Sequence, residues 1–216
     1  MKKTARILSA LLALASAPSF AVIIGFEVTS GAGNPIVTPY VESGYSFTSS
    51  HMHLVGTPTQ CLFGGCVAST TGQYLAEEAG SLGVPITATA APFNLLSFDG
   101  AELFLSDAAA LAGGFPNATV ITVVGVRTDL SIVAASFTLD GSKDGAGGVA
   151  DFQTFFLPSS FTSLMSATFL GTNASGTGGF GIDNIGVTAV PEPSTVVLFL
   201  LGITSLMYFR KRSMKA

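Results

Sequence analysis

Short runs of β-branched and aromatic residues, each closed by a turn signal, constrain the fold of this chain more than any other feature. Residues 119–126 are dense in Val, Ile and Thr, and residues 131–139 form a second run that stops at Asp140-Gly141. Turn signals spaced by roughly 8–12 residues are typical of sandwiches and barrels. Further candidate strands are 23–28, 45–49, 85–90, 101–105, 152–157 and 164–170. The pattern predicts an all-β domain, a single β-sandwich, with short helical turns at most at 73–80 and 106–112.

Basic side chains are nearly absent from the middle of the chain. Between Val22 and Pro191 only Arg127 and Lys143 are basic, against twelve acidic residues. Affinity for nucleic acid comes mainly from Lys and Arg side chains that neutralise phosphates. The composition therefore excludes nucleic acid as a partner.

Residues 1–21 have the three parts of a secretory signal peptide. Lys2, Lys3 and Arg6 form the positive start, and residues 7–15 form an apolar segment that is too short to span a bilayer. Ser-Phe-Ala at 19–21 fits a cleavage site, and an uncleaved N-terminal anchor is the alternative. The sequence predicts export through the secretion machinery.

The last residues, 190–216, have three parts as well. A Pro-Glu-Pro motif comes first, an apolar run at 196–209 follows, and a basic cluster ends the run. The two prolines keep the motif extended. As a helix the run would span roughly 21–24 Å, which is short for a hydrocarbon core of about 30 Å. The basic cluster would hold the C-terminus in the cytoplasm. The residues concerned are Pro191, Glu192, Pro193, Arg210, Lys211 and Arg212.

This tail resembles the PEP-CTERM sorting signal of exported Gram-negative proteins, which an exosortase processes. The resemblance implies that Pro191, Glu192 and Pro193 are the recognition motif and that the enzyme cleaves near them. It also implies a precursor that is held in the inner membrane by a transmembrane helix and faces the periplasm. The processed protein would then reach the cell surface or the extracellular matrix. A plain single-span anchor is the alternative.

The segment between the two ends, 22–189, carries a pair of short motifs at its own ends. Gly25-Phe26-Glu27-Val28 stands near the start, and residues 179–185 include Asp183. The pair resembles the jelly-roll sandwich of carbohydrate-binding modules and galactose-binding-like domains. The resemblance implies that Glu27 and Asp183 lie close together and hold a structural calcium ion, a hard cation that prefers oxygen ligands. Ordinary solvated carboxylates are the alternative.

Two cysteines and two histidines are the remaining candidates for special chemistry. Cys61 and Cys66 close a short glycine-containing loop, which in an exported protein favours a disulfide over a metal or redox pair. His51 and His53 would share one face of a strand and could bind a metal, or they are polar side chains on an edge strand.

The function expected from these features is that of a non-catalytic exported protein in the cell envelope or the polysaccharide matrix. The alternative is a carbohydrate-binding module that binds polysaccharide through Tyr40, Tyr45 and Tyr74, which lie in loop-like or edge-like stretches. A hydrolase is a remote third hypothesis. The carboxylate pair that a hydrolase could use is Asp99 and Glu102, but the pattern there is more typical of a turn followed by the start of a strand.

Overall fold

A computed structural model of the 216-residue chain separates two units. Residues 21–189 form a compact domain, and residues 1–20 with 190–216 form the other unit. The structure describes residues 21–27, 39–49, 52–57, 66–67, 69, 72–77, 86–105, 116–143, 149–190 and 202–205.

Little of the second unit is described. Residues 202–205 are helical, and no helix in the described part of the chain is long and apolar enough to cross a membrane. The predicted signal peptide, the Pro-Glu-Pro motif and the basic cluster lie outside the described residues. They stay predictions.

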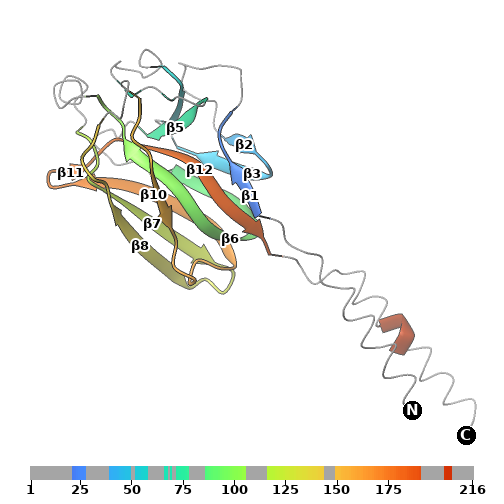
Figure 1. The fold of residues 1–216 in the computed structure, drawn as a ribbon. Coiled ribbons are helices and arrows are strands. Elements are labelled where there is room, and N and C mark those ends of the chain that lie inside the picture. Colours follow the sequence, from blue (N-terminus) through green and yellow to red (C-terminus); the bar gives the residue numbers. More distant parts are fainter. Residues whose placement is uncertain are drawn as a thin grey trace, which may run out of the picture. The chain divides into compact units, whose positions relative to one another are not determined.

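The domain is built from strands, so the all-β prediction is confirmed (Figure 1). In chain order the strands are β1 (Ala21–Ile24), β2 (Tyr40–Glu42), β3 (Tyr45–Thr48), β4 (Met52–Val55), β5 (Tyr74–Glu77), β6 (Ile86–Glu102), β7 (Val120–Arg127), β8 (Ile132–Thr138), β9 (Gln153–Phe156), β10 (Leu164–Asn173), β11 (Gly176–Thr177) and β12 (Phe180–Ala189). One predicted helical turn is wrong, because Tyr74–Glu77 is a buried strand. The other, 106–112, lies outside the described residues.

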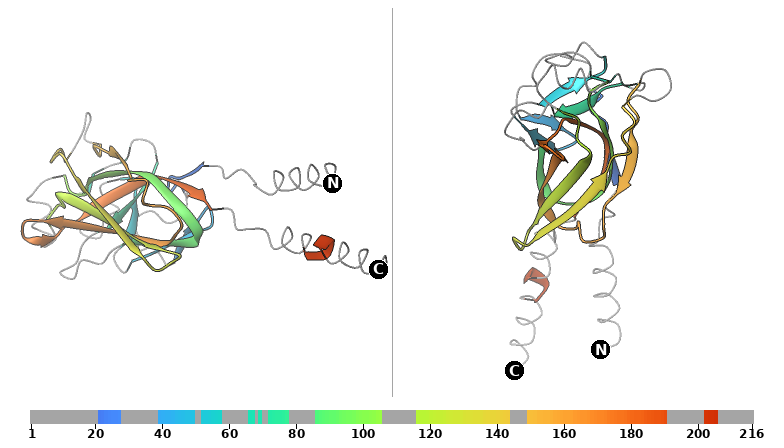
Figure 2. Two further views of the ribbon diagram at one scale, coloured as in Figure 1. Left: turned by 90° about the horizontal axis from the view of Figure 1, so that it is seen from below. Right: turned by 90° about the vertical axis from the view of Figure 1, so that its left-hand side faces the viewer.

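The strands form one hydrogen-bonded network rather than two separate sheets. The main order is β4-β5-β12-β6-β10-β7-β8, with β1 on β12, β3 and β9 on β6, β2 on β3 and β11 on β10. Neighbouring strands run antiparallel throughout these pairings. The network curls so that its two halves enclose a common core, as the two layers of a sandwich do (Figure 2).

The 17-residue strand β6 joins the two halves. Its first part pairs with β3 and β10, and its last part pairs with β12 and β9. The sequence indicated two separate strands here, 85–90 and 101–105, and Pro92 between them has no N–H to donate to a neighbouring strand. In the structure Pro92 falls where the register with β10 shifts between Thr89 and Phe93, so the strand continues past it.

Aromatic side chains fill the space between the two halves. The ring of Phe98 on β6 lies 5.3 Å from the rings of Phe137, Phe155 and Phe169, which come from β8, β9 and β10. Alternate residues of a strand point to opposite faces, and that alternation sends Phe98 inward and Ser97 and Asp99 outward. The core therefore fixes which side chains β6 presents at the surface.

Candidate functional site

The three tyrosines that the sequence suggested as ligand-binding residues are buried. Tyr40, Tyr45 and Tyr74 are 9%, 6% and 0% exposed. The Tyr74 hydroxyl donates to the carbonyl oxygen of Val67 at 2.8 Å, and the ring of Tyr45 packs edge-on against Phe93. These rings belong to the core, so the prediction of an exposed tyrosine surface is wrong.

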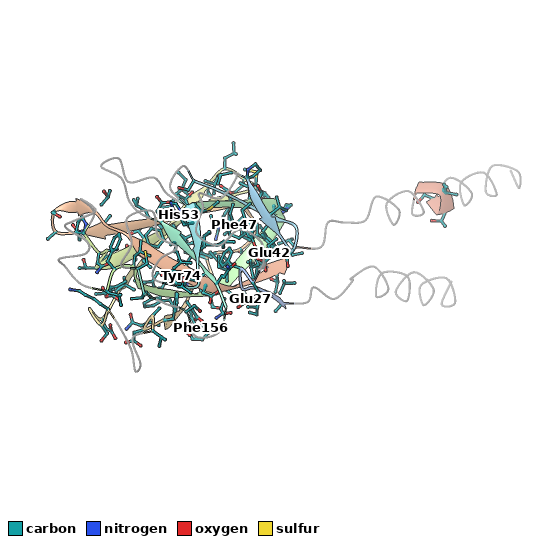
Figure 3. All side chains as sticks on the ribbon, turned by 90° about the horizontal axis from the view of Figure 1, so that it is seen from above. Glu27, Glu42, Phe47, His53, Tyr74 and Phe156 are labelled. Atoms are coloured by element: carbon teal, nitrogen blue, oxygen red, sulfur yellow. The ribbon has the colours of Figure 1, made fainter. Side chains whose placement is uncertain are left out.

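An exposed aromatic ring is found instead at the end of β9. Phe156 is 76% exposed, whereas its neighbour Phe155 points inward and packs on Phe98. Figure 3 shows Phe156 at the margin of the domain and Phe47 within it. Because most of the Phe156 ring is in contact with water, the ring contributes little to the stability of the fold through burial.

Polar groups stand beside this ring on the same face. Thr154 and Phe156 are two residues apart on β9, and they pair with Asp99 and Ser97 on β6. The Thr154 hydroxyl donates to Asp99 Oδ1 at 2.6 Å, and the Asn184 side-chain amide donates to Asp99 Oδ2 at 2.9 Å. Asp99 is thereby fixed in one orientation next to the exposed ring.

This face includes a glycine, which has no side chain. Gly186 on β12 pairs with Ser97 on one side and with Ile23 of β1 on the other. A Cβ at Gly186 would lie 2.5 Å from Ser97 Oγ, so any larger residue there would displace the Ser97 side chain. Ile23 is 58% exposed and closes the row opposite Phe156.

We call Phe156, Thr154, Asp99, Ser97, Gly186, Asn184 and Ile23 the Phe156 face. From β9 to β1 the face crosses three strand spacings, or roughly 14 Å. It combines an apolar ring and an apolar rim with hydroxyl, amide and carboxylate groups between them.

A group of acidic side chains adjoins this face. Asp183 pairs with Asp99 across β12 and β6 and is only 4% exposed, although Glu27 is exposed. Burial, together with the negative charges of Glu27, Asp99 and Glu42, raises the pKa of Asp183 to about 7, although the 2.7 Å hydrogen bond from the Asn184 N–H opposes the shift. The charges that act on this carboxyl are all negative.

The backbone is bent at both ends of this acidic group. Phe26 and Asn184 have φ values of 57° and 45°, which side-chain-bearing residues rarely adopt. Gly72 has a φ of 149°, and a Cβ at this position would overlap the Glu27 carboxylate. The strained backbone at Phe26 and Asn184 and the space beside Gly72 together place Glu27 near Asp183.

The ligand atoms that Glu27 and Asp183 offer are of the kind that calcium prefers. Carboxylate oxygens gathered without a basic neighbour are ligands that a hard divalent cation prefers, and calcium also accepts backbone carbonyls and water. Within the part of the chain that the structure describes, no group of three His, Cys, Asp or Glu side chains is close enough to hold a metal ion. Glu27 and Asp183 would therefore need carbonyl oxygens or water to complete a site.

The other predicted special residues are only partly described. Cys66 is fully buried, while Cys61 lies outside the described residues, so their disulfide stays a prediction. His53 is 2% exposed within β4, so it is not a polar side chain on an exposed edge. His51 lies outside the described residues.

Comparisons with known proteins add a distant structural likeness. A carbohydrate-binding module of family 29 aligns with a TM-score of 0.43 and 10% identity over 80% of this chain and 90% of that one. A variant of such a module in complex with mannohexaose gives 0.42 and 11% over 80% and 93%. A DUF4465 family protein from Bacteroides caccae gives 0.49 and 11% over 80% and 100%. All three TM-scores are below 0.5. No protein-family model and no curated protein sequence matches the chain.

Sequence reasoning missed Phe156, although a signal for it existed. Residues 152–157 were identified as a strand, and in any strand adjacent residues face opposite sides. One of Phe155 and Phe156 therefore had to face outward. The sequence does not say which one, because that depends on which face of β9 meets Phe98.

Proposed function

We propose that residues 22–189 form a non-catalytic glycan-binding module of an exported protein, with the Phe156 face as its binding surface. The observation that carries the proposal is the 76% exposure of Phe156 beside an ordered group of hydrogen-bonding side chains. Exposed apolar groups, here Phe156 and Ile23, that flank a few fixed polar groups are the combination typical of a ligand-binding site.

The chemistry of the face matches that of a sugar chain. A pyranose ring has an apolar face of C–H groups and a rim of hydroxyls, so it can pack on an aromatic ring while its hydroxyls form hydrogen bonds. Phe156 offers the ring, and Asp99, Ser97 and Thr154 offer acceptors and hydroxyls at the adjacent register positions. A face roughly 14 Å across is open at its surface and suits an extended stretch of polysaccharide.

Binding rather than hydrolysis is favoured by the positions of the acids. Asp99 and Glu102 were the carboxylate pair considered for a hydrolase. They are three residues apart on β6, and therefore point to opposite faces of the strand. Asp99 is at the Phe156 face, whereas Glu102 is buried and accepts a hydrogen bond from Gly141 N at 2.8 Å.

Calcium is part of the proposal as a structural ion. Glu27 and Asp183 would hold it, and its charge would offset the repulsion that Asp183 experiences from its acidic neighbours. Because Asp183 pairs with Asp99, the ion would also steady the polar side of the Phe156 face.

The route out of the cell is proposed from the sequence. Recognition of Pro191, Glu192 and Pro193 by an exosortase would release the domain into the envelope or the polysaccharide matrix, where a glycan-binding module has its ligand. Intact mass of the protein recovered from its own cells measures this. A product that ends near Glu192, with the tail retained when the Pro-Glu-Pro motif is altered, is the expected result, and an intact tail in both proteins would contradict it.

Retention of the full-length protein in affinity gels tests the binding site. The gels contain a mannan, a β-glucan or a galactan, and wild type is compared with Phe156→Ala. We expect at least one polymer to retard the wild type and Phe156→Ala to lose about tenfold or more in affinity, because the packing surface for the sugar ring is removed. Ile132→Ala is the matched control, since Ile132 is 70% exposed but lies on β8. Equal retardation of wild type and Phe156→Ala would overturn the proposal.

A further inference from the structure

Strand β8 is the longest edge of the described sheet. It is the last strand of the main order, and among the strands that the structure describes it pairs only with β7 (Figure 1). It has seven residues, whereas the other described edge strands, β1, β2, β4, β9 and β11, have two to four. An edge strand presents backbone N–H and C=O groups with which another strand can pair.

The hydrogen bonds at the two ends of β8 show which backbone groups face outward. Arg127 N donates to the Ser131 carbonyl at 2.9 Å, and Leu139 N donates to the Thr119 carbonyl at 3.0 Å. The register between β7 and β8 has no shift between these two pairs. In an antiparallel pair every second residue bonds to the neighbouring strand, so the odd-numbered residues of β8 bond to β7. The N–H and C=O groups that point away from β7 are those of Ile132, Ala134, Ser136 and Thr138.

The devices that usually protect an edge strand are missing from β8. Edge strands commonly carry charged side chains, a proline or a bulge, or they are covered. The sequence of β8 is Ile-Val-Ala-Ala-Ser-Phe-Thr, with no charge and no proline, and its register with β7 is regular. Its even-numbered residues are exposed. β4, at the opposite end of the main order, differs because all four of its residues are buried.

The core is incompletely closed along β8. The inward side chains of this strand, Val133, Ala135 and Phe137, are only partly buried where they pack against the core. The ring of Phe137 lies 5.2 Å from the ring of Phe155 on β9, which is partly buried as well. A strand added to β8 would therefore remove apolar surface from water in addition to forming backbone hydrogen bonds.

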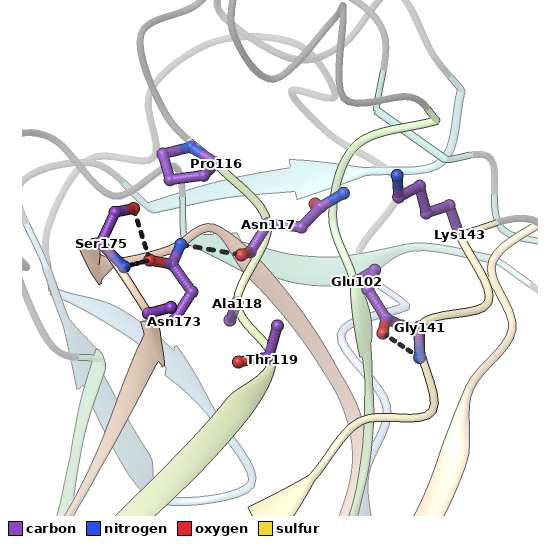
Figure 4. Close-up of a pocket in the computed structure, with 10 residues that line it drawn as sticks. Glu102, Pro116, Asn117, Ala118, Thr119, Gly141, Lys143, Asn173 and Ser175 are labelled. Atoms are coloured by element: carbon purple, nitrogen blue, oxygen red, sulfur yellow. Dashed lines mark hydrogen bonds between the residues drawn. The ribbon is translucent and has the colours of Figure 1, made fainter.

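Both ends of β8 are held by side-chain hydrogen bonds. Before the strand, Asp129 Oδ1 accepts from the N–H of Ser131 at 2.9 Å. After the strand, Gly141 N donates to Oε1 of the buried Glu102 at 2.8 Å (Figure 4), and Asp140 N donates to Gln153 Oε1 at 3.2 Å. An edge that is already ordered loses little conformational entropy when a partner strand pairs with it.

The inward side chains of β8 are complementary to those of a second, antiparallel β8. When two copies pair about Ala135, the two Ala135 residues face each other and Phe137 faces Val133 of the second copy. Alanine permits close approach at the centre, and a pair of an aromatic and a β-branched residue is favourable across two strands.

The same pairing matches the backbone groups and the charges. The even-numbered residues of each copy face one another, and with one N–H and one C=O on each of the four they would form roughly eight hydrogen bonds. The nearest charged residues, Asp129 and Asp140, lie beyond the seven paired residues. No like charges therefore face each other within the paired stretch.

We infer that β8 is a dimerisation edge, at which a second copy of this chain adds its own β8 antiparallel and makes the two sheets continuous. The contact is the same patch on both copies, as a two-fold dimer requires. Two strands of seven residues form a small interface, so the association should be reversible, with a dissociation constant of about 100 µM or less. The inference goes beyond the proposed glycan binding and does not depend on it.

Disulfide cross-linking of the full-length protein in detergent tests the inference. Ala135→Cys would place the two new cysteines in a non-hydrogen-bonded pair with Cα atoms about 4.5 Å apart, a distance that a disulfide can bridge. We expect mild oxidation to yield a covalent dimer. Thr122→Cys is the matched control, because Thr122 is also half-buried but lies on β7, which would put its two copies at least roughly 14 Å apart. Wild type, with its own two cysteines, gives the background. Failure of Ala135→Cys to cross-link above wild type and Thr122→Cys would overturn the inference.

A proline on the open edge tests the same contact without a cross-link. The N–H of Ala134 points away from β7, so Ala134→Pro keeps the bonds between β7 and β8 but removes one donor from each copy and sets its ring in the edge. We expect the dissociation constant of the dimer to rise about tenfold or more, as measured by light scattering with the detergent mass subtracted. Ala134→Val keeps the N–H and is the matched control, and circular dichroism checks that both variants fold. A wild type that is monomeric at about 100 µM, or a dimer that Ala134→Pro leaves unchanged, would contradict the inference.

Discussion

The two halves of the curled sheet present different outer faces to solvent. We call the outward side chains of β7, β8 and β10 the hydroxyl face. Its members are Val120, Thr122, Val124, Val126, Ile132, Ala134, Ser136, Thr138, Ser166, Thr168, Leu170 and Thr172. None of them is charged or aromatic. The Phe156 face, on the other half, has an exposed ring and a carboxylate.

The difference shows which face serves the fold and which does not. On the hydroxyl face, β-branched and hydroxyl side chains interact across strands, as Thr122 Oγ1 and Ser136 Oγ do at 2.9 Å. Such cross-strand pairs stabilise a sheet. On the Phe156 face the ring of Phe156 is 76% exposed, so packing does not explain its position, whereas the proposed glycan binding would.

The largest effect is expected at the residue that supports both faces. Phe98→Ala would remove a fully buried ring that contacts Phe137, Phe155 and Phe169, and should lower the free energy of unfolding by about 3–5 kcal/mol. Urea denaturation measures the loss. A loss below about 1 kcal/mol would mean that the two halves do not share this core.

Calcium and pH should act next most strongly, through Asp183 beside the Phe156 face. Asp183 has a folded pKa of about 7, well above its ordinary value of 3.8. Between these values the folded state keeps a proton that the unfolded state has lost, so stability in chelator should fall as pH rises from 4 to 7 and level off above 7. The slope for one proton is at most about 1.4 kcal/mol per pH unit.

Adding calcium in that titration should raise the melting temperature most at pH 7 and above, since the ion favours ionised Asp183. Asp183→Asn should melt higher than wild type in chelator at pH 8 and gain nothing from calcium. Thermal melts at pH 5 and pH 8, with chelator or calcium, measure both effects. A wild-type melting temperature that does not respond to calcium at pH 8 would contradict the proposed calcium site.

Gly72→Ala tests how the Glu27 carboxylate is positioned, and its expected effect on stability is smaller. The added Cβ would overlap the Glu27 carboxylate, and the φ of 149° disfavours alanine, so we expect a loss of about 1–3 kcal/mol. Gly141→Ala is the control, because its φ of 86° also disfavours alanine but nothing lies within 4 Å of the new Cβ. If calcium stabilises Gly72→Ala as much as it stabilises wild type, Glu27 is not a ligand.

The smallest effect is expected on the hydroxyl face. Thr122→Val keeps the β-branched shape and loses one exposed hydrogen bond to Ser136, so stability should change by less than about 0.5 kcal/mol. Polysaccharide retention should not change. A loss of retention in this variant would move the binding surface to the hydroxyl face.

The central strands could be predicted from the sequence because their signal is local. The runs at 119–126 and 131–139 contain the β-branched residues that favour strands, and the structure has β7 and β8 at these places within one residue at each end. β6 was predicted in two pieces, since the tolerance of Pro92 depends on a register shift against β10 that no local pattern reveals.

The residues of the candidate site were harder to predict because exposure is decided by tertiary packing. Tyr40 is buried with its hydroxyl donating to Glu42 at 2.8 Å, so a partner two residues away satisfies the polar group that was expected to face water. Glu102 looked like the start of a strand, and its burial beside Gly141 depends on a turn 39 residues later. Glu27 and Asp183 were identified because a resemblance, rather than local pattern, linked the two ends of the domain.

Hydroxyl-radical footprinting with and without polysaccharide tests the central claim most directly. In the free protein Phe156, Leu130 and Ile132 should all be oxidised, because they are 76%, 73% and 70% exposed. With a polymer that retards the protein in gels, we predict that Phe156 becomes protected while Leu130 and Ile132 do not. Protection of Leu130 and Ile132 with an unchanged Phe156 would contradict the account.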